Sequence, residues 1–399
     1  MWRVGSDDGG DGIVKIYSAH NRPIFSICIV PWPARGIDLA ISCSMDRHVA
    51  CWECSRSGQS RERWRARGFG GHPSAVNVSR GVLSEVAVGC GDKSIRLYRE
   101  SEESELLQET HFIWSGVGAK VLHTSFHPGD SDVVVFYTDD KTMGVYDKVG
   151  DVNACVRLTK HDVANCMWRS QEEGDGTDAI LYSLDDSGFL FKWHHSVHQW
   201  ASMDEEDVLQ PVSLPHGIQG TIKAFGWCNQ GKLLAFGTDA KHMHCFSEDS
   251  NGDLEAIAQT ACHPSVVSCV CVQTKDADPG HETAATVVVG HEDGKLTVVS
   301  LRGAGVGCGH SVQILDPVHK SIVVGIQFNP FSQHFASGAA DGTLVIWTVR
   351  GHGVSKHADL RGHHAGILSV AWSLKCRGNY LYTASEDQTL RCWNVFGRG

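Results

Sequence analysis

One short pattern recurs nine times along the 399 residues of the chain. An Asp-led turn is followed by a strand of alternating apolar residues, which closes on a large apolar side chain. The most regular copy runs from Asp341 to Trp347, and the closing residues fall at positions 17, 52, 98, 146, 193, 246, 299, 347 and 393. After the first interval the copies are 46 to 53 residues apart. A fixed period of this size indicates a repeat architecture, in which each unit buries its apolar surface against its neighbours.

Each unit also has an ordered interior. An apolar strand ending in Trp or Phe comes first, a strand of small and apolar residues follows, and the Asp turn leads into the third strand. This grammar resembles the WD repeat, in which four strands form one blade of a β-propeller, so the fold class expected is all-β. The resemblance implies that a His, a Ser or Thr, the turn Asp and the strand Trp hydrogen-bond within a blade. The residues that match these roles most fully are His363, Thr383, Asp387 and Trp393.

The number of units predicts how the chain divides. Seven units follow residue 68, and seven is a common number of blades for a closed WD propeller. We therefore expect residues 68–399 to form a seven-bladed propeller. Residues 1–54 would then be the last two blades of a truncated first propeller, joined by an Arg-rich linker at 55–67. The last unit lacks a fourth strand, which a segment within 55–67 could supply. The alternative is one larger ring of eight or nine units.

Composition and motifs give no indication of an enzyme. The chain has no G-x-S-x-G, no phosphate-binding Gly-rich loop and no HExxH motif, so no catalytic residue, metal or cofactor is expected. The pair Cys51 and Cys54 is an isolated CxxC without a second pair. Most of the 15 Cys lie inside expected strands, which is typical of buried thiols in a reducing compartment. There is neither a leading signal peptide nor an apolar run of membrane-spanning length.

The net charge of −11 argues against a generally basic surface, but the charges are unevenly spread. Residues 55–67 contain five arginines: Arg56, Arg61, Arg63, Arg65 and Arg67. Two acidic insertions, 171–178 and 274–283, lie between the first and second strands of their units. In a propeller this places them on one face. We expect the arginines to gather near the other face.

Three residues suggest a binding site on that other face. Arg47 follows the turn residue Asp46, Arg22 lies in a loop between units, and Phe69 lies in the next such loop. Guanidinium groups beside an exposed aromatic ring suit single-stranded RNA, whose bases stack on such planes and offer edges for hydrogen bonding. The sequence therefore predicts that Arg22, Arg47 and Phe69 form one pocket.

A closer resemblance supports this prediction. In register over nearly the whole chain, the sequence is similar to the Gem-associated protein 5 family, the RNA-recognition subunits of the SMN complex. The segments that carry it best are 40–52, 86–92, 114–117 and 126–128. The resemblance implies binding to the uridine-rich Sm site of snRNA, delivery of that RNA for Sm-ring assembly with SMN complex proteins, and a place in cytoplasm and nuclear bodies. It implies RNA contacts by Arg22, Arg47 and Phe69. Lys120, in the loop between units after Trp114, is a further candidate for a phosphate contact. Ala164 and Ala340 stand where the family has tyrosines.

A protein-interaction scaffold without RNA binding is the alternative from another functional class. WD propellers commonly bind peptides, and acidic loops on one face suit a basic partner. The two hypotheses differ in salt dependence and in the recognition of uridine.

Overall fold

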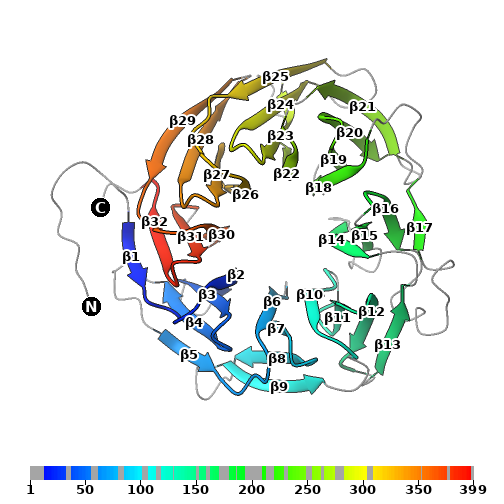
Figure 1. The fold of residues 1–399 in the computed structure, drawn as a ribbon, viewed down its shortest axis with the longest axis vertical. Coiled ribbons are helices and arrows are strands. Elements are labelled where there is room, and N and C mark those ends of the chain that lie inside the picture. Colours follow the sequence, from blue (N-terminus) through cyan, green and yellow to red (C-terminus); the bar gives the residue numbers. More distant parts are fainter. Residues whose placement is uncertain are drawn as a thin grey trace.

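The computed structural model describes one ring of strands around a central channel (Figure 1). It describes residues 13–32, 37–54, 62–79, 85–100, 107–113, 118–128, 130–149, 152–158, 162–169, 179–185, 187–193, 209–212, 220–228, 232–248, 254–261, 265–274, 283–302, 309–351, 353–374 and 378–396. These residues form eight four-stranded antiparallel sheets, the blades of a β-propeller. No helix of the described residues has the length and apolar character needed to span a membrane.

Seven blades are each built from four consecutive strands, which run from the channel outward. The first is β2 (Ile24–Trp32), β3 (Ile37–Ser44), β4 (Val49–Cys54) and β5 (Glu62–Ala66); the second is β6 (Pro73–Val78), β7 (Glu85–Cys90), β8 (Ile95–Glu100) and β9 (Leu107–Ile113); the third is β10 (Val121–Phe126), β11 (Val133–Thr138), β12 (Thr142–Asp147) and β13 (Val152–Arg157); the fourth is β14 (Val163–Arg169), β15 (Ile180–Asp185), β16 (Leu190–Trp193) and β17 (Leu209–Pro211). The fifth is β18 (Ile222–Cys228), β19 (Leu233–Thr238), β20 (His242–Glu248) and β21 (Leu254–Ala261); the sixth is β22 (Val267–Thr274), β23 (Thr283–His291), β24 (Leu296–Arg302) and β25 (Gly309–Leu315); the seventh is β26 (Val323–Phe328), β27 (His334–Ala339), β28 (Leu344–Arg350) and β29 (Gly353–Leu360).

The eighth blade joins the two ends of the chain. Its inner strands are β30 (Ile367–Trp372), β31 (Tyr380–Ser385) and β32 (Leu390–Asn394), and its outer strand is β1 (Ile13–Tyr17). β1 pairs antiparallel with β32, with Ile13 opposite Trp393 and Tyr17 opposite Leu390. In Figure 1 the blue β1 lies beside the red β32. The pairing closes the ring and covers the strand edge that β32 would otherwise expose.

The expected division into a partial and a seven-bladed propeller is not confirmed. Residues 13–54 take part in the same ring as the rest of the chain, which matches the larger ring held open as the alternative. The first copy of the repeated pattern, 11–17, is an outer strand rather than a third strand, because outer strands alternate in the same way. It is this copy, and not residues 55–67, that supplies the missing fourth strand of the last unit.

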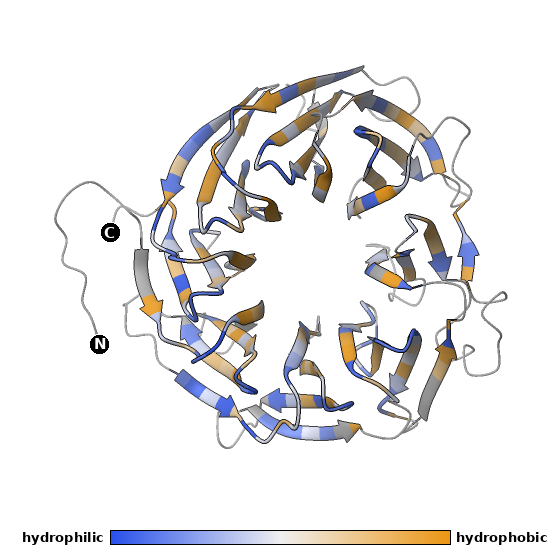
Figure 2. Cartoon of the chain, viewed as in Figure 1, coloured by the Kyte–Doolittle hydropathy of each residue, from blue (hydrophilic) through white to orange (hydrophobic). Residues whose placement is uncertain are grey.

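The core lies between neighbouring blades. Every residue of β7, β11 and β19 is buried, as expected for second strands that are covered on both faces. The closing residues of the repeats are buried too: Trp52, Trp193, Trp347 and Trp393 are at most 6% exposed. Figure 2 shows the apolar residues concentrated on the strands. Contact between β2 and β30 continues this packing across the point where the ring closes.

The loops sort onto two faces. One face, here called the turn face, carries the Asp turns between second and third strands and the loops that enter each new blade. The two kinds of loop bond each other: Asp46 accepts from the backbone N of Asn21 (3.2 Å), and Asp92 accepts from that of Gly70 (2.8 Å). The opposite face carries the turns between first and second strands. The acidic insertions expected there, 171–178 and 274–283, lie almost entirely outside the described residues, so the charge separation stays a prediction.

Candidate nucleic-acid interface

The hydrogen-bonded tetrad expected in the eighth blade is present. His363 Nδ1 lies 2.8 Å from Asp387 Oδ2, and its Nε2 lies 2.6 Å from Thr383 Oγ1. Trp393 Nε1 donates to the same Thr383 hydroxyl at 2.8 Å. Two strands, the turn between them and the loop before β30 are thus tied by side chains that are almost wholly buried, which holds the Asp turn in one conformation.

The first blade repeats this tetrad directly beneath the candidate site. His20 contacts Asp46 and Ser42, each at 2.9 Å, and Trp52 Nε1 donates to Ser42 Oγ at 3.2 Å. Burial alone would raise the pKa of Asp46, but the hydrogen bond with His20 and the backbone donors outweigh it and lower that pKa to about 2. Asp46 is therefore a fixed anion that holds the turn on which Arg47 sits.

Arg22 and Arg47 lie together on the turn face, as predicted. Both side chains are exposed, and Ser44 links their segments: its hydroxyl donates to the carbonyl of Arg22 (3.0 Å), and its own carbonyl accepts from the N of Arg47 (3.2 Å). Arg47 has a φ of 65°, a left-handed conformation that costs a residue with a Cβ roughly 1–2 kcal/mol. Neither guanidinium has an acidic partner among the described residues.

Phe69 does not complete this pocket. The sequence predicted an exposed ring, but Phe69 is only 4% exposed and belongs to the core between the first and second blades. The guanidinium of Arg96 covers the ring, with its carbon 4.2 Å from the ring centroid. Arg96 is itself held by the carbonyl of Gly68 (3.1 Å). Burying so large an apolar ring is favourable, so the ring packs into the core although Phe69 lies in a loop. Phe69 therefore offers no face on which a base could stack.

The Arg-rich stretch is not a linker. Its described part is β5, the outer strand of the first blade. Arg65 makes a bidentate contact with Glu62 (2.7 and 2.8 Å) and donates to the carbonyl of Ala19 (2.8 Å). Arg63 donates to Glu53 at 3.3 Å. Two of the predicted cations are therefore paired, Arg67 is exposed, and Arg56 and Arg61 lie outside the described residues.

Lys120 extends the exposed cations beyond the first blade. Its backbone N donates to Asp139 (3.0 Å), and a Cβ built on Gly91 would lie 3.7 Å from its Cγ. The stem of Lys120 thus runs against the Asp turn of the second blade. That turn carries another exposed cation, Lys93, which sequence reasoning missed. The signal was available, because Lys93 follows Asp92 as Arg47 follows Asp46.

The structure also reveals an aromatic beside the two arginines. Phe25 is 36% exposed and Met45 39% exposed, and the N of Met45 donates to the carbonyl of Pro23 (3.0 Å). Phe25 is the unpaired residue of a β-bulge between Ile24 and Ser26. All eight inner strands carry a bulge at this place, which turns one residue out of the ladder. The alternation of apolar and polar residues does not reveal where a bulge lies, so the sequence did not predict that Phe25 is exposed.

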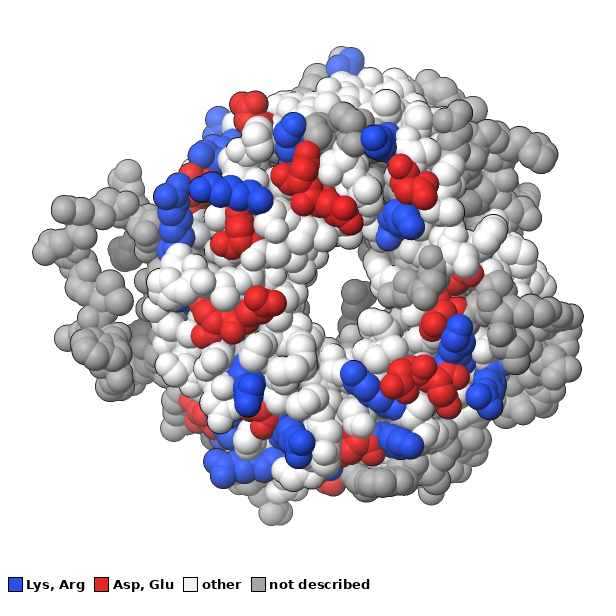
Figure 3. Space-filling model, viewed as in Figure 1, with Lys and Arg blue, Asp and Glu red and all other residues white. Residues whose placement is uncertain are grey.

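The surface around these groups is not uniformly basic. On the face that Figure 3 shows, basic and acidic side chains alternate around the rim. Asp46 and Asp92 of the turn face bond their own turns, and Glu62 of β5 pairs with Arg65. Exposed cations without an acidic partner among the described residues thus remain over the first three blades: Arg22, Arg47, Lys93 and Lys120.

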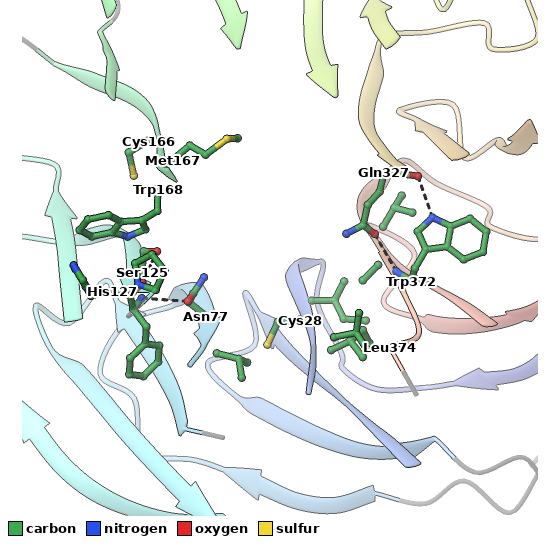
Figure 4. A pocket seen from close by; sticks show the side chains of 17 residues that line it. Cys28, Asn77, Ser125, His127, Cys166, Met167, Trp168, Gln327, Trp372 and Leu374 are labelled. Carbon is green, nitrogen blue, oxygen red and sulfur yellow. Dashed lines mark hydrogen bonds between the residues drawn. The ribbon is translucent and has the colours of Figure 1, made fainter. Parts of the chain in front are cut away.

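A second candidate site is a pocket of about 530 Å³ in the central channel (Figure 4). It is lined by the inner strands of six adjacent blades, from the seventh through the eighth to the fourth. Its polar groups join the blades to one another. Gln327 Oε1 accepts from the N of Trp372 (2.9 Å), and Asn77 Oδ1 accepts from the N of Phe126 (3.3 Å). Within the described residues no cluster of His, Cys, Asp and Glu could hold a metal ion.

Comparisons with known proteins agree with the repeat pattern. The family model described as WD domain, G-beta repeat, matches residues 11–53, 309–348 and 354–394. Each matched segment takes in the outer strand of one blade and the first three strands of the next. The described residues form an eight-bladed β-propeller, and the matched segments within it are WD repeats.

The resemblance to Gem-associated protein 5 is confirmed. The Homo sapiens protein is 24% identical over 388 residues, which cover 94% of this chain, and the Mus musculus protein is 24% identical over 389 residues. The chain spans 22% of the length of each of these relatives. Among solved structures, Sqt1 of Saccharomyces cerevisiae superposes with a TM-score of 0.71 at 10% identity, covering 97% of this chain and 100% of Sqt1, a likeness of fold alone.

Proposed function

We propose that this propeller is an RNA-binding, non-enzymatic module of the Gem-associated protein 5 kind, which recognises the uridine-rich Sm site of snRNA. In this proposal it delivers that RNA for Sm-ring assembly together with SMN complex proteins, in the cytoplasm and in nuclear bodies. The observation that carries the proposal is the group of exposed cations on the turn face, in a chain that resembles Gem-associated protein 5 over 94% of its length.

The chemistry of the first blade suits a splayed nucleotide. Arg22 and Arg47 supply planar donor forks with no competing acid among the described residues, and the tetrad beneath fixes the turn that carries Arg47. Phe25 and Met45 add apolar surface beside them. Bases stack on aromatic and guanidinium planes, and uracil edges accept hydrogen bonds, so this group can both hold a base and read it. Lys93 and Lys120 would contact phosphates as point charges.

The backbone of Arg47 allows a sharp test. In the seventh blade the equivalent turn position is Gly342, with a φ of 80°. Arg47→Gly therefore removes the guanidinium while it relieves backbone strain. We expect Arg47→Gly to weaken binding of an Sm-site RNA by about 5- to 150-fold, the range for loss of a base contact, without lowering the melting temperature. Fluorescence anisotropy against a cytidine-substituted RNA, at two salt concentrations, measures the effect.

Lys232→Gly provides the matched control. Lys232 is an exposed cation with a φ of 45°, but it lies between β18 and β19 on the opposite face. It should leave RNA binding unchanged. If the wild-type chain binds both RNAs equally, or if Arg47→Gly has no effect, the proposal fails and an interaction scaffold without RNA binding takes its place.

A further inference from the structure

The turn between the second and third strands of the fourth blade carries an aromatic ring directly after its left-handed residue, Gly188. In three other turns, the hydroxyl of the residue after the left-handed position donates to the turn carboxylate. Thr343 donates to Asp341 and Thr389 to Asp387, both at 2.6 Å, and Ser94 donates to Asp92. In the fourth blade this position is Phe189, a residue with no hydroxyl to donate.

Phe189 is held rigidly and is left open to solvent. Its N donates to Asp185 Oδ1 (2.8 Å) and its carbonyl accepts from the N of Asp185 (3.0 Å). The preceding Gly188 has a φ of 82° and lies against Thr221 of the fifth blade, where a Cβ would approach the Thr221 Cβ to 2.6 Å. The side chain of Phe189 is nevertheless 60% exposed. A fixed backbone under an exposed aromatic ring is a ready surface for stacking, because little conformational freedom is lost on contact.

Exposed cations connect this ring to the first blade. The turn of the first blade carries Arg47, that of the second carries Lys93, and Lys120 lies against Gly91 where the second blade meets the third. Between the third and fourth blades, Tyr137 accepts from the N of Val163 (2.9 Å). The four blades from Arg47 to Phe189 are therefore consecutive and joined.

The acids along this arc are engaged in local contacts. Asp92 accepts from the N of Gly70, and Asp139 accepts from the N of Lys120. Asp162 bonds Tyr137 and lies 3.2 Å from Lys141 Nζ. The exposed lysines and Arg47 thus supply an interrupted row of positive charge, with aromatic rings at both ends: Phe25 in the first blade and Phe189 in the fourth.

We propose that this arc of the turn face, from Phe25 and Arg47 over Lys93 and Lys120 to Phe189, is a continuous path for one single strand of RNA. Phosphates follow the cations, and a base stacks on Phe189 at the far end. Alternation of aromatic platforms with backbone-tracking cations is how proteins hold single strands. This inference rests on the proposed function, because it extends the strand that Arg22 and Arg47 would bind.

The test compares two lengths of RNA, each with the wild-type chain and with variants at Phe189. Two uridine-rich RNAs of about 6 and about 14 nucleotides span the usual range of site sizes for single strands. We expect Phe189→Ala to weaken binding of the longer RNA by about 5- to 150-fold, the effect of losing one stacked base. Binding of the shorter RNA should be unchanged. Phe189→Trp should keep the affinity of the wild type. Phe331→Ala is the control, since Phe331 is 53% exposed but lies between β26 and β27 on the opposite face.

The outcomes separate the two proposals. If Arg47→Gly weakens the shorter RNA but Phe189→Ala leaves the longer one unaffected, the path is refuted and the proposed function stands. Equal losses for Phe189→Ala and Phe331→Ala would also refute the path. If the wild-type chain binds neither RNA at low salt, the proposed function fails, and the path fails with it.

Discussion

At the scale of single residues, some side chains stabilise the blades and others form the exposed surface of the turn face. The tetrad residues are buried and mutually bonded, while the residues that follow the turn Asp differ from blade to blade. Arg47, Lys93 and Lys141 all adopt a positive φ that Gly342 adopts without cost. A charged residue at a position that favours Gly trades some stability for surface chemistry, which is typical of functional loops.

Trp347→Ala tests the buried kind. Trp347 is 3% exposed, stacks near Phe335 with ring centroids 6.0 Å apart, and donates to Ser337 at 2.9 Å. Removing the ring should cost about 3–5 kcal/mol of unfolding free energy, the usual cost of truncating a large core aromatic. Chemical denaturation measures this loss, and a value under about 1 kcal/mol would contradict the packing seen around Trp347.

Phe69→Ala and Phe25→Ala separate burial from binding. Because Phe69 is core, its truncation should lower the unfolding free energy by about 3–5 kcal/mol while affinity for RNA changes little. Phe25→Ala should do the reverse. It should weaken the affinity for RNA by about 5- to 150-fold and change the unfolding free energy little. Paired melting curves and anisotropy titrations decide. Loss of binding by Phe69→Ala in a chain that melts like the wild type would restore the original prediction for Phe69.

At the scale of the strand, the repeat in the sequence and the blade in space are out of step. Each matched WD segment begins in the outer strand of one blade, so the first segment contributes β1 to the eighth blade. This offset converts the two ends of the chain into one sheet. It also means that closure of the ring depends on a strand of only five residues.

Tyr17→Ala and Ile16→Ala test the closing strand. Adjacent residues of a strand point to opposite faces, and here Tyr17 is 4% exposed while Ile16 is 39% exposed. Tyr17 lies 5.2 Å from Trp52 of the first blade, so it also joins two blades. Tyr17→Ala should lower the unfolding free energy by at least about 2 kcal/mol, whereas Ile16→Ala should lower it by under about 1 kcal/mol. Similar losses for both variants in thermal melts would place β1 differently.

At the scale of the whole molecule, the stability of the ring depends on pH, because some of its buried side chains are titratable histidines. Burial lowers the pKa of both His244 and His319 from the ordinary 6.5 to about 4. His319 precedes the inner strand of the seventh blade, with its Nε2 2.7 Å from the Ser337 hydroxyl. Both groups are neutral in the fold, so protonation opposes folding.

Stability should therefore fall with acid within a defined window. A depressed His pKa contributes stability that is present above pH 6.5 and is lost as the pH falls toward 4. The carboxylate of Asp46, with a pKa of about 2, stays ionised through this window and does not cause the loss. We expect the melting temperature to fall between pH 6.5 and 4, and less steeply in His319→Gln. A flat profile would show that these His do not remain neutral in the fold.

The sequence alone determined the repeat, the strand order within a unit and the hydrogen-bonded tetrads, because these depend on contacts within one unit. The tetrad of His363, Thr383, Asp387 and Trp393 could be named from spacing, and so could the shared face of Arg22 and Arg47. Tertiary structure alone decided the rest. The number of blades follows from how neighbouring sheets pack and from the pairing of β1 with β32 across the whole chain. The exposure of Phe69, Phe25 and Phe189 depends on what the next blade places beside each ring, since an apolar ring is buried wherever a neighbour can cover it.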